Sequence, residues 1–236
     1  MSESLRIALI AEGPTDKIVI EAALKAILQQ PFVLIPLQPE PTRPDLGGGW
    51  CGVLKWCREF RARGYGSFEE DPTLELYDFF ILHLDADVAH KSYSDVGPAI
   101  EQEAQQSAWG ALPCFQPCPP PGATVNGLKS VLFSWLGVAS VGSRTVLCIP
   151  SKSTETWLAV AVYPDNENLL NGLECTLIME GRLASLSKGQ RIRKSAREYT
   201  NHAATITGAW DSVRAQCSQA DVFHNNSTTI LMGEAA

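Results

Sequence analysis

The feature that most constrains the fold of this chain is a short apolar run, residues 79–84 (FFILHL), followed at once by two acidic residues. Apart from His83, the run shows no alternation of polar and apolar side chains, which is typical of a strand buried on both faces of a parallel sheet. Asp85 and Asp87 then lie at the carboxyl end of that strand, where open α/β sheets bind their ligands. Because two carboxylates this close repel each other, we expect a divalent cation, held by oxygen atoms, between or beside them.

Further stretches of the chain predict other elements of the same sheet. Residues 5–11 (LRIALIA) and 32–37 (FVLIPL) read as strands, and residues 17–29 have apolar side chains at helical spacing, with Thr15 as the expected cap. A strand–helix–strand crossover of this kind implies parallel strands. Another strand is expected at residues 144–149. We therefore predict an α/β fold of the Rossmannoid kind, in which helices flank a mainly parallel sheet.

The remaining segments are predicted to be helices and loops. Helices are expected over residues 50–63, 125–136, 177–186, 192–206 and 207–220. Three consecutive glycines, residues 47–49, are expected to give a flexible loop, and residues 225–236 have no clear period and are expected to fray. Because the chain becomes polar and helical beyond Pro164, we predict a catalytic domain over residues 1–163 and a helical extension over residues 164–236.

Composition narrows the class of protein. A chain of 236 residues with 45% hydrophobic and 19% charged residues can bury a full core. No apolar run approaches the roughly 20 residues of a membrane helix, and the N-terminus lacks the basic region of a secretory signal. The seven cysteines form no regular framework, which favours a reducing cytoplasm. Cys114 and Cys118 form a C-x3-C pair, but no second pair accompanies them to complete a zinc site.

Charge is unevenly distributed along the chain. The net charge of −7 argues against a surface that coats nucleic acid indiscriminately, yet residues 182–197 contain six basic residues and no acidic one. Arg191, Arg193, Lys194 and Arg197 are therefore candidate contacts to nucleic-acid phosphates. A solvated helix face is the alternative interpretation.

Acidic residues follow three of the predicted strands. Glu12 follows the first, Asp85 and Asp87 the central one, and Glu155 the last, while Asp16 falls in the first turn of the first helix. Because all carboxyl ends of a parallel sheet lie at one edge, these groups can converge. Together they could hold one or two Mg²⁺ or Mn²⁺ ions. Enzymes that transfer or hydrolyse phosphoryl groups with two metal ions use a carboxylate set of this kind. The alternatives are charges that favour helix N-termini, and solvated Asx turns for the aspartate pair.

The order of these motifs resembles the topoisomerase–primase (Toprim) domain. The fuller pattern is similar to the Toprim branch of the OLD (overcoming lysogenisation defect) family nucleases, in a small stand-alone form. Its segments are EGPTD at 12–16, LDAD at 84–87 and IPSKSTETWLAVAV at 149–162. They cover residues 5–163, and the tail beyond Pro164 matches no known pattern.

The resemblance implies a Mg²⁺- or Mn²⁺-dependent endonuclease that hydrolyses DNA, with Glu12, Asp16, Asp85, Asp87 and Glu155 binding metal. It also implies a role for Lys152 in screening charge, although an exposed loop lysine is the alternative. Family members of this size often act in anti-phage defence beside a separate ATPase, so an ATPase partner is expected. The oligomeric state is not predicted.

Two histidines flank the aspartates. We interpret His83 as a core histidine satisfied by a backbone group rather than a ligand. His90 is a candidate phosphate contact or proton carrier, and an ordinary loop histidine is the alternative.

Other functions remain open. The sequence LDADVA is also similar to the first motif of haloacid-dehalogenase-type phosphatases, in which the first aspartate, here Asp85, is the nucleophile. However, that motif normally opens its fold, whereas two predicted strands precede it here. A glycosyltransferase D-x-D motif is a further alternative, as is a non-catalytic Toprim-like subunit that binds a partner.

Overall fold

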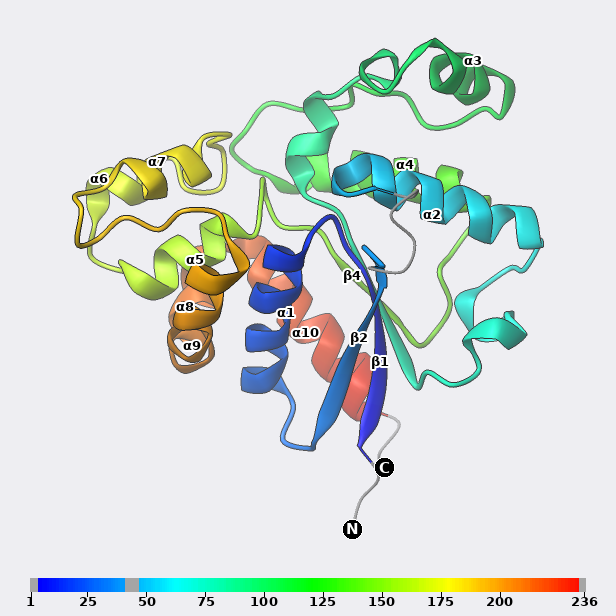
Figure 1. Cartoon of the computed structure of the whole chain (residues 1–236). Coiled ribbons are helices and arrows are strands. Elements are labelled where there is room, and N and C mark those ends of the chain that lie inside the picture. The colour runs from blue at the N-terminus through cyan, green and yellow to red at the C-terminus, as the bar shows by residue number, and fades with distance from the viewer. Residues whose placement is uncertain (1–3, 41–46, 234–236) are drawn as a thin grey trace.

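The protein, described by a computed structural model over residues 4–40 and 47–233, is built around a four-stranded sheet (Figure 1). All strand pairs are parallel and their order is β2-β1-β3-β4. The strands are β1 (Leu5–Ile10), β2 (Phe32–Gln38), β3 (Phe79–His83) and β4 (Thr145–Cys148). The predicted α/β fold with a parallel sheet flanked by helices is therefore confirmed.

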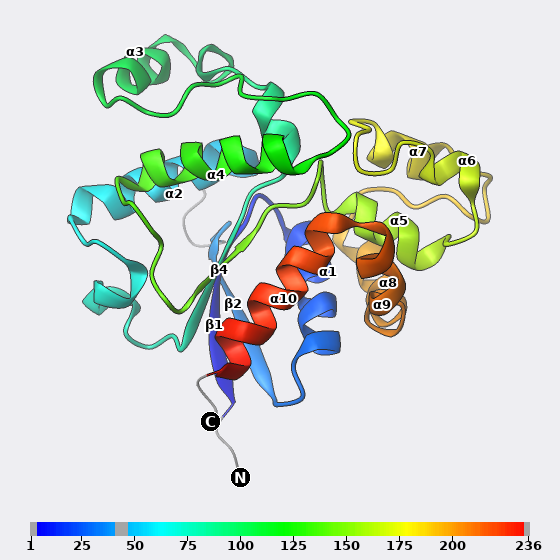
Figure 2. The same ribbon diagram turned by 180° about the vertical axis from the view of Figure 1, so that it is seen from behind.

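Helices cover both faces of the sheet. The α-helices are α1 (Pro14–Ile27), α2 (Gly49–Arg63), α3 (Pro98–Gln106), α4 (Gly122–Leu136), α5 (Glu155–Val162), α6 (Glu167–Leu170), α7 (Met179–Ser185), α8 (Ala196–Gly208), α9 (Trp210–Gln216) and α10 (Ser218–Gly233). The 3₁₀ helices are η2 (Phe68–Glu70), η3 (Pro72–Leu74), η4 (Ala86–His90) and η5 (Tyr93–Asp95). Helices α1 and α10 lie on one face of the sheet with α5, α8 and α9 beside them, and α2 and α4 lie on the other (Figures 1 and 2).

The central strands β1 and β3 are buried on both faces, from Ile7 to Ile10 and from Phe79 to His83, whereas the edge strand β2 is mostly half-buried. Side chains of odd-numbered residues such as Leu9 and Ile81, which are paired in register, pack toward α1 and the C-terminal helices. Even-numbered residues such as Ile10 and Phe80 join a second core with α2 and α4. The apolar run of β3 thus has the central position that its lack of alternation predicted.

The C-terminal helices share the first of these cores. Tyr199, Trp210 and Phe223 belong to the same buried cluster as the sheet and α1. The Thr207 hydroxyl on α8 also donates a hydrogen bond of 2.8 Å to the Ala22 carbonyl on α1. The segment after Pro164 is therefore a layer packed against the sheet, and the functional division at residue 163 stays a prediction.

Several predicted helix boundaries are wrong: α8 begins at Ala196 instead of residue 192, and the helix predicted over residues 207–220 is divided among α8, α9 and α10. Helix α1 begins at Pro14, with Gly13 as its N-cap, so Thr15 lies inside the helix and does not cap it. Proline suits the first helical turn because its fixed φ matches the helical value. A backbone N–H at that position would have no partner within the helix, so its absence costs nothing. Of the residues 225–236 predicted to fray, 225–233 instead belong to α10, and 234–236 lie outside the described residues.

A disulfide joins Cys118 to Cys175 and links the proline-rich segment before α4 to the loop before α7. Cys114, the other member of the C-x3-C pair, is a free thiol.

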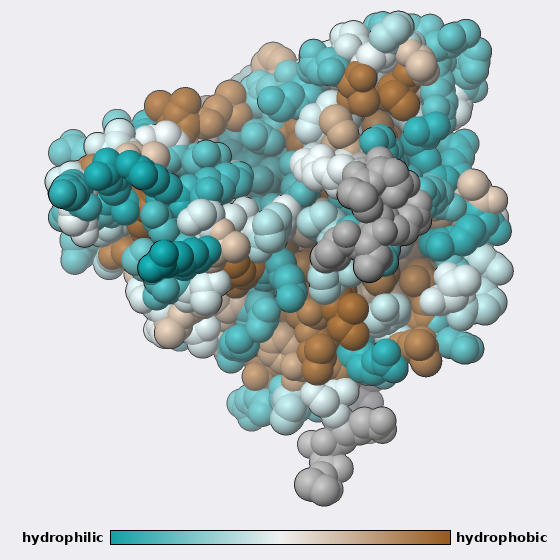
Figure 3. All heavy atoms as spheres, in the orientation of Figure 1, coloured by the Kyte–Doolittle hydropathy of each residue, from teal (hydrophilic) through white to brown (hydrophobic). Residues whose placement is uncertain are grey.

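In the described part of the chain, no helix is both long and apolar enough to cross a bilayer. Apolar and hydrophilic side chains are interspersed over the face shown in Figure 3. The cytoplasmic location stays a prediction.

Candidate metal centre

Glu12 lies in the turn between β1 and α1, and hydrogen bonds hold it at the edge of the sheet. Its Oε1 accepts a hydrogen bond of 2.8 Å from the backbone N–H of Asp85, and its carbonyl accepts one of 2.8 Å from Gly49. Gly49 has a φ of 65°, which glycine adopts without strain. Gly49, one of the three glycines predicted to form a flexible loop, is therefore the first residue of α2, and its hydrogen bond to Glu12 connects α2 to the β1–α1 turn.

Asp85 follows β3 on the same side as His83, because residues two apart in a strand point the same way. His83 Nε2 lies 3.1 Å from Asp85 Oδ1, and the imidazole is fully buried. Its Nδ1 has no hydrogen-bond partner among the described residues. The interpretation of His83 as a histidine satisfied by a backbone group is wrong, since its partner is a carboxylate of the centre.

Asp16 enters the same centre from the first turn of α1. Its side chain is buried, and its Oδ1 accepts a hydrogen bond of 2.7 Å from the Thr154 hydroxyl, in the loop between β4 and α5. Three strand ends are therefore connected through side chains that lie far apart in the sequence.

These residues form two groups that could each hold a metal ion. One group is Asp16, His83 and Asp85, and the other is Glu12, Asp85 and Asp87. Within each group the candidate ligand atoms lie within 4.8 Å of one another, and Asp85 belongs to both. The predicted convergence of Glu12, Asp16, Asp85 and Asp87 at one edge of the sheet is therefore what the structure has. Their role as metal ligands stays a prediction.

The environment of the centre disfavours the charged forms of its carboxylates. Burial, followed by the nearby charge of Asp85, raises the pKa of Glu12 well above its usual value. Burial and the charge of Asp16 raise the pKa of Asp85, and burial raises the pKa of Asp87. Carboxylates in this state take up either protons or a cation. The hard oxygen donors suit Mg²⁺ or Mn²⁺, whereas the His83 imidazole is a ligand more typical of zinc, iron, copper or nickel.

Lys152 borders the centre on the side of Asp87. The Lys152 carbonyl accepts a hydrogen bond of 3.0 Å from the Asp87 N–H, which pairs the D-x-D segment with the chain after β4. The Lys152 side chain is buried, and burial lowers its pKa. Its Nζ lies 3.3 Å from Nε2 of His90. The alternative of an exposed loop lysine is therefore wrong.

Glu155 differs from the other predicted ligands because it already has partners. Its Oε1 accepts a hydrogen bond of 2.7 Å from the Tyr199 hydroxyl and lies 3.0 Å from Lys194 Nζ. Burial would raise the pKa of Glu155, but the Lys194 charge and hydrogen bonds, including one from Ser153, outweigh it and lower the pKa. Glu155 belongs to neither metal-capable group of the described residues.

Lys194 is the residue of the basic segment 182–197 that contacts Glu155. Its ammonium pairs with Glu155 and lies 3.5 Å from Glu180, so this predicted phosphate contact is engaged by carboxylates. Arg191, Arg193 and Arg197 are exposed beside it. Sequence reasoning missed Tyr199 and the pairing of Lys194, for which the sequence offers no local pattern.

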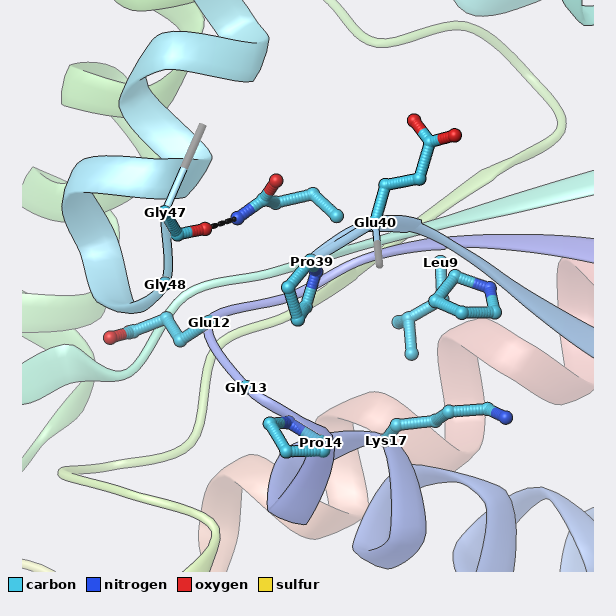
Figure 4. Close-up of a pocket in the computed structure, with 11 residues that line it drawn as sticks. Leu9, Glu12, Gly13, Pro14, Lys17, Pro39, Glu40, Gly47 and Gly48 are labelled. Carbon is cyan, nitrogen blue, oxygen red and sulfur yellow. Dashed lines mark hydrogen bonds between the residues drawn. The ribbon is translucent and has the colours of Figure 1, made fainter. Parts of the chain in front are cut away.

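A cavity of about 510 Å³ flanks the centre beside Glu12. Its lining is mostly apolar and includes Pro14 and Pro39, with Lys17 at its rim (Figure 4). The Glu12 side chain extends away from Pro39 and Glu40 (Figure 4). Among the described residues of the two metal-capable groups, Glu12 lines this cavity, so the cavity borders the centre.

Comparisons of the chain with family models, with curated proteins and with solved structures found no match. The fold and site thus define an α/β protein with a carboxylate-rich candidate metal centre at the carboxyl edge of a parallel sheet.

Proposed function

We propose that the protein is a Mg²⁺- or Mn²⁺-dependent endonuclease of the Toprim type that hydrolyses phosphodiester bonds in DNA. The observation that carries the proposal is the pair of metal-capable groups that share Asp85. Such a site binds one or two ions at the sheet edge where α/β proteins place their ligands.

The residues of the centre have separate parts in this proposal. Glu12, Asp85 and Asp87 hold one ion, and Asp16 and His83 join Asp85 around a second. A bound ion of this kind supplies Lewis acidity and lowers the pKa of water at the phosphate. Lys152 donates a hydrogen bond to a phosphate oxygen and balances the charge that develops there. Glu155 holds Lys194 in place and does not itself bind metal.

The basic segment supports DNA as the substrate. Lys194 pairs with Glu155, and Arg191, Arg193 and Arg197 are exposed in the same segment, so these arginines are the candidate contacts to the phosphates of a DNA substrate. The role in anti-phage defence and the separate ATPase partner complete the proposal and rest on the motif resemblance, whereas the cytoplasmic location rests on the absence of a regular cysteine framework in the sequence. Co-purification of the tagged chain with the product of a neighbouring ATPase gene tests the partner.

The activity is tested on purified protein with plasmid and linear DNA, in the presence of Mg²⁺, Mn²⁺ or EDTA. We expect metal-dependent cleavage that is lost in Asp85→Asn and Glu12→Gln. Asp211→Asn and Glu101→Gln are matched controls, because they make the same changes on exposed carboxylates. Cleavage that survives both substitutions in the centre would reject the assignment. Hydrolysis of p-nitrophenyl phosphate without DNA cleavage would instead support the phosphatase alternative.

A further inference from the structure

An exposed aromatic ring lies just outside the centre, and the proposed function does not account for it. Phe115, in the proline-rich segment before α4, leaves 52% of its surface exposed. Its ring stacks on the His90 imidazole, with 4.5 Å between ring centroids and 14° between ring planes. Single exposed apolar side chains are common on protein surfaces, so what relates this ring to the centre is its stacking on His90, whose Nε2 lies 3.3 Å from Lys152 Nζ.

The position of this ring is fixed by its surroundings. The backbone N–H groups of Cys114 and Phe115 both donate to the Ala89 carbonyl, at 2.8 and 3.1 Å. The N–H of Gln116 donates a hydrogen bond of 2.9 Å to the Thr124 hydroxyl, and the Cys118–Cys175 disulfide anchors the segment further on. Because this segment is already held in place, little conformational entropy would be lost when a ligand stacks on Phe115.

A short path of contacts connects the ring to the metal centre. Phe115 stacks on His90, His90 Nε2 lies 3.3 Å from Lys152 Nζ, and the Lys152 carbonyl accepts the Asp87 N–H. An aromatic surface and a nitrogen donor thus lie beside the D-x-D segment, to which the Lys152 backbone is hydrogen-bonded. These are the parts needed to hold a base and its adjoining phosphate.

We propose that Phe115, supported by His90, is a stacking platform for an unpaired nucleobase next to the phosphate that is cleaved. The inference deepens the proposed nuclease function and rests on it for the position of that phosphate. Stacking on an aromatic ring tolerates any base, since every base has a π face. The base must leave its duplex to stack, so the site selects single-stranded or frayed DNA.

The test measures binding separately from cleavage. A fluorescent oligothymidylate, and an oligomer of the same length made of abasic units, are titrated with protein in EDTA and in Ca²⁺. We expect Phe115→Ala to weaken binding of the oligothymidylate by about 5- to 150-fold, the equivalent of roughly 1–3 kcal/mol for one stacked base. Binding of the abasic oligomer should change less than twofold, and Phe115→Trp should bind at least as tightly as wild type.

Leu177→Ala is the matched control, because Leu177 is equally exposed at 52% but lies in another loop. An unchanged affinity of Phe115→Ala for the oligothymidylate would overturn the platform, even if the protein cleaves DNA. An equal loss for both oligomers would also overturn it, since that result would reflect a general disturbance. Base-dependent loss without any cleavage would support the platform and refute the nuclease.

Discussion

Substitution of Asp85 by asparagine should stabilise the metal-free protein, and the gain should grow with pH. Asparagine keeps the shape of the side chain and the backbone N–H that binds Glu12, but it removes the charge shared by both metal-capable groups. Two charges no more than 4.8 Å apart at an effective dielectric of about 20 repel by at least roughly 3 kcal/mol. Asp85 is 5% exposed, so water screens this repulsion little.

The direction of the pH dependence follows from the raised pKa. Burial and the charge of Asp16 raise the pKa of Asp85 in the folded protein, so the folded state holds its proton to higher pH than the unfolded chain. The associated stability is present at low pH and is lost as pH rises through the folded pKa. A folded-state pKa that lies one pH unit above the unfolded value corresponds to about 1.4 kcal/mol, or about 3–5 °C in melting temperature for a chain of this size.

The assay is thermal unfolding of wild type and Asp85→Asn from pH 5 to pH 8, in EDTA and in excess Mg²⁺ or Mn²⁺. In EDTA the two proteins should melt together at pH 5, and the variant should melt higher at pH 8. With metal the order should reverse, because an ion at about 1,000 times its Kd stabilises wild type by about 4.1 kcal/mol, which exceeds the roughly 3 kcal/mol of repulsion. Asp211→Asn, at a 98% exposed side chain, is the control. A difference that does not vary with pH would refute the reasoning.

Two further substitutions test the lysines around the centre. Lys194→Met should lower the free energy of unfolding by about 1–3 kcal/mol in urea titrations, less than the ~3–5 kcal/mol for a fully buried pair, because the Lys194 side chain is 38% exposed. Adding Glu155→Gln should restore most of the loss, and a double variant as unstable as Lys194→Met alone would contradict the ion-pair account. Lys152→Met should slow DNA hydrolysis by roughly 10²–10³-fold while calorimetry shows unchanged Mn²⁺ affinity. A loss of metal affinity would instead place Lys152 in a structural role.

The core of the fold and the convergence of the acids could be predicted because both follow from local patterns. An apolar run without alternation predicts a central strand, as in β3. Parallel strands place their carboxyl ends together, so Glu12 and Asp85 could be expected to meet although 73 residues separate them. No knowledge of side-chain packing is needed for either step.

Other features depend on packing that the sequence does not display. Helix α10 buries side chains at helical spacing, namely Ala220, Phe223, Ser227 and Leu231. Because one of these is a serine and polar residues lie between them, the sequence shows no clear helical repeat of apolar residues. The Cys118–Cys175 disulfide spans 57 residues, so no short spacing indicates it.

The partners of Glu155 show how the C-terminal helices contribute to the centre. Because α8 packs beside α1 and α5, it brings Tyr199 and the preceding Lys194 to a buried carboxylate that would otherwise lack a counter-charge. Among the residues that the structure describes, Glu12, Asp16, Asp85 and Asp87 have no ion pair with a lysine or arginine. The chain thus neutralises Glu155 internally and leaves four clustered carboxylates without a basic side chain paired to them in that described part. That division of charge is the strongest physical reason to expect an external cation at those four residues and not at Glu155.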